Sequence, residues 1–358
     1  MKILFGTLTC FIWYDIIFYM KYSKELVQAI KDRILINVPS HPNDLVRYSI
    51  ENLSISRNTA LKYISELIEE KKLLRSDAGR YTSYSLPVET ADFTFRMSKK
   101  LSEENIAEKI LSFIGNIQPS VAQIFDYAFM EITNNAIEHS DAKKIHVQAQ
   151  KSIGKIRITI QDDGIGIFKK IKDSLGLQNE KQAVIELSKG KFTSSPEKHS
   201  GEGIFFSSKL CDKFFILSDG LIFSPQQIDT QTAGGEELGK GTKVTFEINL
   251  DTKKVAKEIF DEYAGFDYDK PKFKTVVQLR FMQQEGLTLT SRSQARRLLT
   301  RMEKFTTVVL DFQEVNFIGQ AFADEIFRVY AKKHPAIKFQ STNESPQVRA
   351  MIAHVEAQ

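Results

Sequence analysis

Residues 131–139 read Glu-Ile-Thr-Asn-Asn-Ala-Ile-Glu-His, and this stretch decides how the middle of the chain folds. Glu131, Asn135 and His139 are spaced four residues apart, so on a helix they share one face. Because apolar side chains crowd the same segment, we predict a partly buried helix that ends at His139. A carboxylate on such a face can orient a water or take a proton, and a carboxamide oxygen suits Mg²⁺.

Three further segments combine glycines with one polar side chain. Residues 161–167 (Gln-Asp-Asp-Gly-Ile-Gly-Ile) predict the end of a strand, where Asp163 can accept a hydrogen bond from an exocyclic amine and the glycines admit a flat ligand. Residues 200–204 (Ser-Gly-Glu-Gly-Ile) open an apolar helix whose first N–H groups suit a phosphate. Residues 239–242 (Gly-Lys-Gly-Thr) precede a strand and bring the Thr242 hydroxyl within reach of a ligand. Each pattern alone is common.

Taken in order, the four segments resemble the nucleotide-binding boxes of the GHKL ATP-binding superfamily, which includes gyrase, Hsp90, histidine kinases and MutL. The resemblance covers residues 91–250 and implies a GHKL α/β sandwich (the Bergerat fold) that binds ATP with Mg²⁺. It implies that Asn135 holds Mg²⁺ with the ATP phosphates and that Asp163 reads the adenine amine. It also implies nucleotide contacts for four glycines and one threonine: Gly164, Gly166, Gly201, Gly203 and Thr242.

Within the superfamily, the pattern Glu-x-x-x-Asn-Ala-x-x-His is most similar to that of the anti-sigma-factor serine kinases. In those proteins the glutamate that matches Glu131 is the catalytic base. The histidine-kinase branch is rejected, because its phosphoacceptor histidine precedes the ATP domain. Here only His41 does so, and it stands beside Pro42 in an expected turn.

The polar, lysine-rich segment 169–200 is expected to form the lid over ATP. Four cationic side chains in it are candidates for phosphate contacts: Lys189, Lys191, Lys198 and His199.

Residues 21–86 predict three helices followed by a β-hairpin, an order that resembles a winged helix-turn-helix. The third helix, from Arg57 to Lys72, would enter the major groove of DNA. Its exposed polar residues at the N-terminal end are Arg57, Asn58 and Lys62, and Arg75 and Arg80 would contact phosphates from the wing. The block has 11 Lys and Arg against 8 Asp and Glu, a mild excess that leaves a protein-interaction module open as the alternative.

Residues 272–358 alternate strands with helices, which predicts a small α/β domain. Segments 308–312 (Val-Val-Leu-Asp-Phe) and 315–320 (Val-Asn-Phe-Ile-Gly-Gln) resemble the central strand and loop of STAS-like domains. In anti-sigma-factor antagonists a phosphorylatable serine opens the next helix, but residues 319–324 contain no hydroxyl side chain. We therefore expect a docking or dimerisation domain rather than a substrate of the chain's own kinase, joined by a linker over residues 263–272.

The amino-acid composition excludes several classes of protein. With 42% hydrophobic and 26% charged residues and a net charge of +4, the 358-residue chain is neither disordered nor collagenous. Two cysteines exclude a disulfide framework and a cysteine-rich zinc site, so we expect a reducing, cytoplasmic location. Residues 3–20 are almost entirely apolar and aromatic, broken by Asp15, and two interpretations of residues 1–20 stay open: a membrane anchor, or a true start at Met20.

The sequence thus predicts an α+β multidomain protein: a winged helix-turn-helix, a GHKL domain and a STAS-like domain. The first functional hypothesis is an ATP-dependent signalling or transcriptional regulator with DNA and protein partners. The alternatives are a serine/threonine kinase or ATPase that uses Glu131 as base, and a non-catalytic nucleotide-binding adaptor. The sequence leaves the oligomeric state open, a homodimer included.

Overall fold

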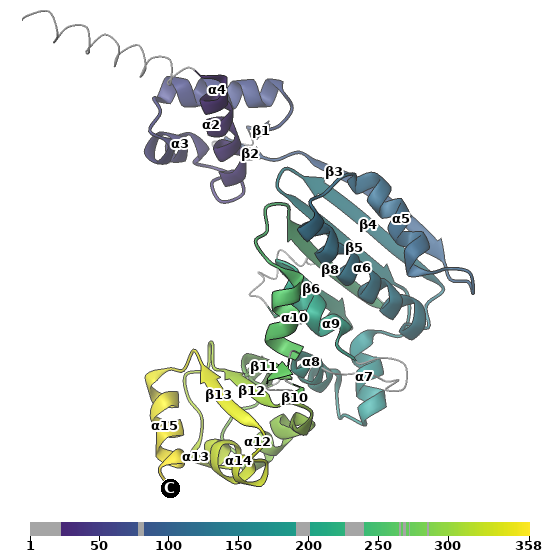
Figure 1. Ribbon diagram of the computed structural model, residues 1–358, viewed down its shortest axis with the longest axis vertical. Helices are drawn as coiled ribbons and strands as arrows, with labels where there is room; N and C mark the ends of the chain where they lie inside the picture. Colours follow the sequence, from purple (N-terminus) through teal and green to yellow (C-terminus); the bar gives the residue numbers. More distant parts are fainter. Residues whose placement is uncertain are drawn as a thin grey trace, which may run out of the picture. The chain divides into compact units, whose positions relative to one another are not determined.

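The computed structural model of the chain is drawn in Figure 1. It describes residues 23–77, 82–190, 201–225, 240–264, 266–267, 270–271, 273–284 and 286–358. The chain divides after Thr90 into two units, with residues 150–155 assigned to the first, and each unit is described by itself. Across the described residues no helix is long and apolar enough to cross a membrane. The apolar residues 1–20 lie outside these ranges.

The first unit has the helices and the hairpin that the sequence predicts. They are α2 (Lys24–Asn37), α3 (Leu45–Leu53), α4 (Arg57–Glu69), β1 (Leu74–Ser76) and β2 (Ser83–Ser85), with β1 antiparallel to β2. Ser23 and Ser56 begin α2 and α4, because each hydroxyl accepts the backbone N–H three residues ahead. Buried apolar side chains join the helices to the hairpin, among them Ile34, Leu45, Leu67, Leu73 and Tyr84.

The second unit is built on a six-stranded sheet in the order β3-β4-β5-β8-β6-β7. The strands are β3 (Val88–Arg96), β4 (Lys144–Ser152), β5 (Lys155–Asp162), β6 (Lys213–Ser218), β7 (Leu221–Phe223) and β8 (Thr242–Asn249). One face is covered by helices α5 (Glu103–Ile114), α6 (Pro119–His139) and α9 (Gly203–Leu210) (Figure 1). Along β5 every second residue is buried, because only one face packs against these helices. The resulting layers form an α/β sandwich.

The segment expected to be a polar lid is largely helical where it is described. It contains α7 (Ile167–Leu175) and α8 (Glu180–Lys189), and every residue of α8 from Gln182 onward is buried. The prediction that Lys189 contacts phosphate is therefore wrong, because its side chain is 1% exposed and bonds to Glu186. Lys191, Lys198 and His199 lie outside the described residues.

A further helix, α10 (Ala256–Ala264), was not predicted and reaches into the expected linker. The rings of Tyr127 of α6 and Phe206 of α9 pack against its Phe260 in edge-on and tilted arrangements, with ring centroids 5.0 and 4.8 Å away. The rest of the expected linker holds the short antiparallel pair β9 (Phe266–Asp267) and β10 (Lys270–Pro271).

The C-terminal part of the unit is a three-stranded parallel sheet, β11-β12-β13, with helices around it. Its strands are β11 (Lys274–Gln278), β12 (Thr307–Asp311) and β13 (Lys338–Thr342). Its helical segments are α11 (Arg280–Gln284), α12 (Arg292–Leu299), η1 (Met302–Lys304), α13 (Gln320–Ala323), η2 (Asp324–Tyr330), α14 (Ala331–Lys333) and α15 (Pro346–Glu356). The alternation agrees with the sequence prediction.

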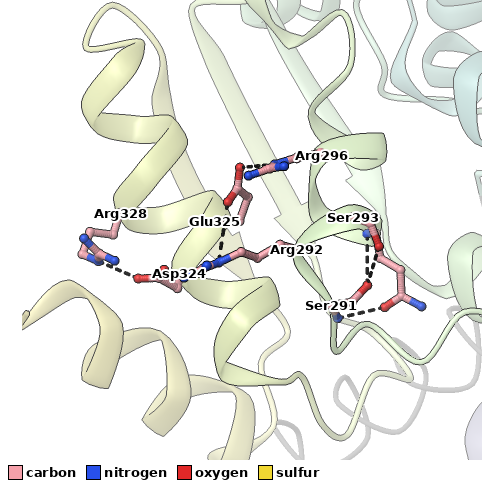
Figure 2. Close-up of polar contacts among 8 residues, drawn as sticks. Ser291, Arg292, Ser293, Arg296, Asp324, Glu325 and Arg328 are labelled. Carbon is pink, nitrogen blue, oxygen red and sulfur yellow. Dashed lines mark hydrogen bonds and ion pairs between the residues drawn. The ribbon is translucent and has the colours of Figure 1, made fainter.

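A row of ion pairs lies between α12 and η2 and within η2, which is a π-helix (Figure 2). Asp324 pairs with Arg328 at 2.5 Å and with Arg292 at 3.2 Å, and Glu325 pairs with Arg296 at 2.8 Å. Both carboxylates are buried while the three guanidinium groups stay exposed. The arginines thus satisfy two acids that would otherwise be costly to bury.

Candidate functional site

A cleft with about 270 Å³ of open space lies where α6, α7 and α9 meet the ends of β5 and β8. Helix α6 contributes the stripe that the sequence predicts. The lining includes Glu131, Asn134, Asn135, His139, Asp162, Gly166, Gly201, Gly203 and Thr242. The structure therefore brings together residues from all four sequence segments.

Gly203 and Glu131 are in close contact across the cleft. Gly203 is the first residue of α9, and a Cβ atom built on it would collide with the Glu131 carboxylate. Only glycine lets the helix begin this near to α6. The first N–H groups of a helix lack partners within it, and they form its positive end. A carboxylate and a helix N-terminus consequently face the same small space.

The two adjacent acids of the glycine segment lie in different places. Asp162 lines the cleft and is 5% exposed. Its Oδ1 accepts the N–H groups of Gly164 at 2.9 Å and Thr242 at 3.3 Å, yet burial raises its pKa to about 6. Asp163 is exposed, and its Oδ1 accepts the N–H groups of Lys143 and Lys144. The expectation that Asp163 faces a ligand does not match this position, because Asp163 fastens the start of β4.

The glycines in and beside the cleft have different roles. Gly166 lines it with φ +87°, a conformation that favours glycine. Gly164 is not part of the lining and packs against the Ser140 carbonyl, where a Cβ would not fit. Gly241, with φ +96°, rests on the backbone of Asp162. Gly241 belongs to the segment 239–242, but the sequence analysis predicted no role for it. Its place between Lys240 and the candidate ligand contact Thr242 was the signal that could have identified it.

Thr242 and Lys170 fix the edges of the cleft. The Thr242 hydroxyl accepts the N–H of Ile167 at 3.0 Å, which ties β8 to the start of α7. Lys170 donates to the carbonyl of His139 at 2.6 Å, a carbonyl that belongs to the last residue of α6. Lys170 also lines the cleft, and sequence reasoning missed it because it fell in the expected lid.

Among the described residues, no cluster of three or more His, Cys, Asp or Glu side chains could hold a metal. Asn135 nevertheless lines the cleft one helical turn from Glu131. Mg²⁺ commonly keeps several waters and binds through one or two protein groups together with substrate phosphates. This donor set fits Mg²⁺ that arrives with a phosphate ligand.

Residues 121–252, which carry all of this geometry, match the family of histidine kinase-, DNA gyrase B- and HSP90-like ATPases. The chain contains a GHKL-type ATPase domain. Residues 294–349 match the STAS-like domain of unknown function. No curated protein matches the chain. The sequence predictions of a GHKL ATPase domain and of a STAS-like domain are confirmed, and neither match covers residues 21–86.

The candidate DNA-contacting residues of the first unit lie on its surface where they are described. Arg57, Asn58 and Lys62 are exposed on the first two turns of α4. Arg75 is exposed on β1, but its Nε donates to Asp77 at 3.0 Å, which ties up part of its charge. Arg80 lies outside the described residues.

Proposed function

We propose that the chain is an ATP-binding regulator in which the GHKL domain binds Mg-ATP in the cleft and the flanking domains respond. The contact between Gly203 and Glu131 carries the proposal, because it sets the positive end of α9 beside a carboxylate. Phosphates bind at such helix ends through backbone N–H groups and the helix dipole. We keep the domain boundaries 21–86, 91–250 and 272–358.

We assign the adenine amine to Asp162 in place of Asp163, because Asp162 lines the cleft. Its Oδ1 already accepts two backbone N–H groups, so we assign Oδ2 to the amine. Gly166 lets the base approach the backbone, and Thr242 supports this end by holding Ile167. Gly201 and Gly203 contact the phosphates at the other end.

Asn135 would hold Mg²⁺ together with the phosphates. The ion, when bound, neutralises charge on the phosphate oxygens. Glu131 accepts the proton of the attacking nucleophile. If that nucleophile is water, the domain is an ATPase; if it is a hydroxyl of a partner protein, the domain is a serine/threonine kinase. Should no transfer occur, the chain is a nucleotide-binding adaptor.

The test is titration calorimetry with Mg-ATP on the full chain, with phosphate release followed in parallel. We expect Glu131→Gln to keep ATP affinity while turnover is lost, and Asn135→Ala to lose Mg-ATP affinity. Glu138→Gln, exposed on the same helix, is the matched control and should change neither. Absence of ATP binding by the unmodified chain would overturn the proposal.

For the first unit we propose a winged-helix domain that binds DNA. Its supporting features are the exposed basic start of α4 and the adjacent hairpin. Fluorescence anisotropy with labelled duplex DNA, with and without Mg-ATP, tests this. Arg57→Ala with Lys62→Ala should weaken binding at least tenfold, on the scale of two lost contacts. If Mg-ATP leaves the DNA affinity unchanged, the proposal that nucleotide binding regulates DNA binding is wrong.

A further inference from the structure

We infer that the STAS-like domain positions one wall of the ATP cleft through α8. Lys189, Glu186 and Arg301 are the positioning residues. The inference rests on the proposed nucleotide binding, and it adds a role for the C-terminal domain within that same site.

One side of α8 belongs to the cleft. Leu187 and the helix-ending Gly190 both line it. Gly190, with φ +76°, lies against Phe205, and a Cβ on it would stand 2.7 Å from the Phe205 ring. Phe205 belongs to the first turn of α9 and also lines the cleft. A displacement of the end of α8 therefore presses directly on the helix assigned to the phosphates.

The other side of α8 is held by the C-terminal domain. Lys189 donates from Nζ to Glu186 at 2.5 Å, to the Thr300 carbonyl at 3.2 Å and to the Arg297 carbonyl at 3.4 Å. An ammonium group has three donors, and these bonds use all of them. The Thr275 hydroxyl donates in turn to the Lys189 carbonyl at 2.6 Å.

Arg301 completes the cluster from the side of the C-terminal domain. Its guanidinium donates to Glu186 Oε2 at 3.1 Å, and its backbone has φ +67°, which is uncommon for a residue with a Cβ. Glu186 and Lys189 are 5% and 1% exposed. Glu186 compensates both cations, and Lys189 is also the donor to the Arg297 and Thr300 carbonyls, so the cluster fixes one arrangement of α8 against the C-terminal domain.

Lys189 and the cleft-lining Leu187 and Gly190 lie within one helical turn, so they move together. The contacts that hold Lys189 therefore also fix the position of the cleft wall that Leu187 and Gly190 form. Linkage requires the converse as well: a nucleotide that prefers one position of the wall stabilises the contacts of α8 with α12 and Arg301.

The test compares Lys189→Met with Lys181→Met in the full chain, because Lys181 is exposed on the same helix. Calorimetry with Mg-ATP should show affinity about tenfold weaker for Lys189→Met and unchanged for Lys181→Met, a size usual for coupled sites. Amide hydrogen exchange should slow in α12 when Mg-ATP binds to the unmodified chain, and this slowing should vanish in Lys189→Met. A merely structural role of Lys189 would not abolish that response in a folded variant.

If Lys189→Met does not fold, Arg301→Gln carries the same test, since its side chain is at the margin of the cluster and 16% exposed. Equal ATP affinity in a folded variant and in the unmodified chain overturns the inference and leaves the proposed function standing. An unmodified chain that binds no ATP overturns both.

Discussion

At the scale of single residues, Asp162 combines a buried carboxylate with a place in the cleft. Burial raises its pKa from the usual 3.8 to about 6, even though Gly164 and Thr242 donate N–H groups to it. A carboxyl with a raised pKa favours the folded state below its unfolded pKa. That advantage is lost as the pH rises from about 4 to about 6. At neutral pH Asp162 thus carries a buried charge that the amine donor of a ligand would stabilise.

We expect Asp162→Asn to stabilise the nucleotide-free chain at pH 7.5 by about 1–3 kcal/mol, because the amide keeps Oδ1 as an acceptor and removes the buried charge. The gain should disappear below pH 4, and ATP affinity should fall. Urea unfolding at both pH values and calorimetry measure these effects.

Asp163→Asn is the control for Asp162→Asn and should have the opposite sign. Although burial opposes it, the N–H groups of Lys144 and Lys143 hold the pKa of Asp163 below its usual range. Its charge therefore favours folding at neutral pH, and removing it should lower stability while ATP binding persists. If both substitutions lower ATP affinity alike, the assignment of Asp162 to adenine is wrong.

Gly203→Ala should lower ATP affinity more than tenfold, because the new methyl group meets the Glu131 carboxylate and pushes α9 from α6. Gly176→Ala is a control with a positive φ of +63° and open space around it. It should cost about 1 kcal/mol of stability with ATP affinity unchanged. Calorimetry and urea unfolding distinguish the two effects, and a Gly203→Ala chain with normal affinity would contradict the close contact.

At the scale of elements, strand β5 shows how far the sequence could lead. Its residues Ile156, Ile158 and Ile160 alternate with polar side chains, so even-numbered positions face the helices. Continuing the alternation places Asp162 inward and Asp163 outward. The inward position of Asp162 was therefore predictable from the period of two along β5, whereas the motif alone, without the strand before it, did not distinguish the two acids.

The burial of helix α8 could not be predicted from the sequence. Its ten residues contain Lys181, Glu186 and Lys189, which favour a solvated segment by composition. Glu186 and Lys189 are nevertheless buried, because Thr275, Arg297 and Arg301 come from a distant part of the chain. A pattern of local spacing cannot report partners that only the tertiary structure brings near, whereas the four nucleotide segments carry their signal locally.

The ion pairs of η2 give a prediction for the STAS-like domain. Hydrogen bonding to Arg328 is the main cause that holds the pKa of Asp324 below its usual range. Its stabilisation is present above the unfolded pKa and is lost as the pH falls through the lower folded value. Asp324→Asn should destabilise the domain at pH 7 by about 1–3 kcal/mol, and the difference should shrink toward pH 3. Thermal unfolding at several pH values measures this.

Glu344→Gln is the control for Asp324→Asn. Its partner Arg349 lies at 3.5 Å and is 73% exposed, so the change should cost less. A larger loss in Glu344→Gln than in Asp324→Asn would contradict the importance assigned to the row of ion pairs.

At the scale of the whole molecule, the ATPase and STAS-like domains share α8. A chain that ends after Ala264 loses the partners of Lys189 and Glu186. We expect its ATPase domain to melt about 10 °C lower than in the full chain, since breaking a buried pair costs about 3–5 kcal/mol. Differential scanning fluorimetry measures this, and proteolysis should cut the shortened chain first within α8. Equal melting temperatures would contradict the prediction.

The burial of α8 also has a consequence for biosynthesis. Lys189 leaves the ribosome 108 and 111 residues before the carbonyls that cap its ammonium group. At translation rates of about 5–20 residues per second, roughly 5 to 20 s pass between the synthesis of α8 and that of the residues that bury Lys189. The ATPase domain therefore cannot mature in the N-to-C order in which it is made. The burial of α8 is completed only once Arg297 and Thr300 have been made.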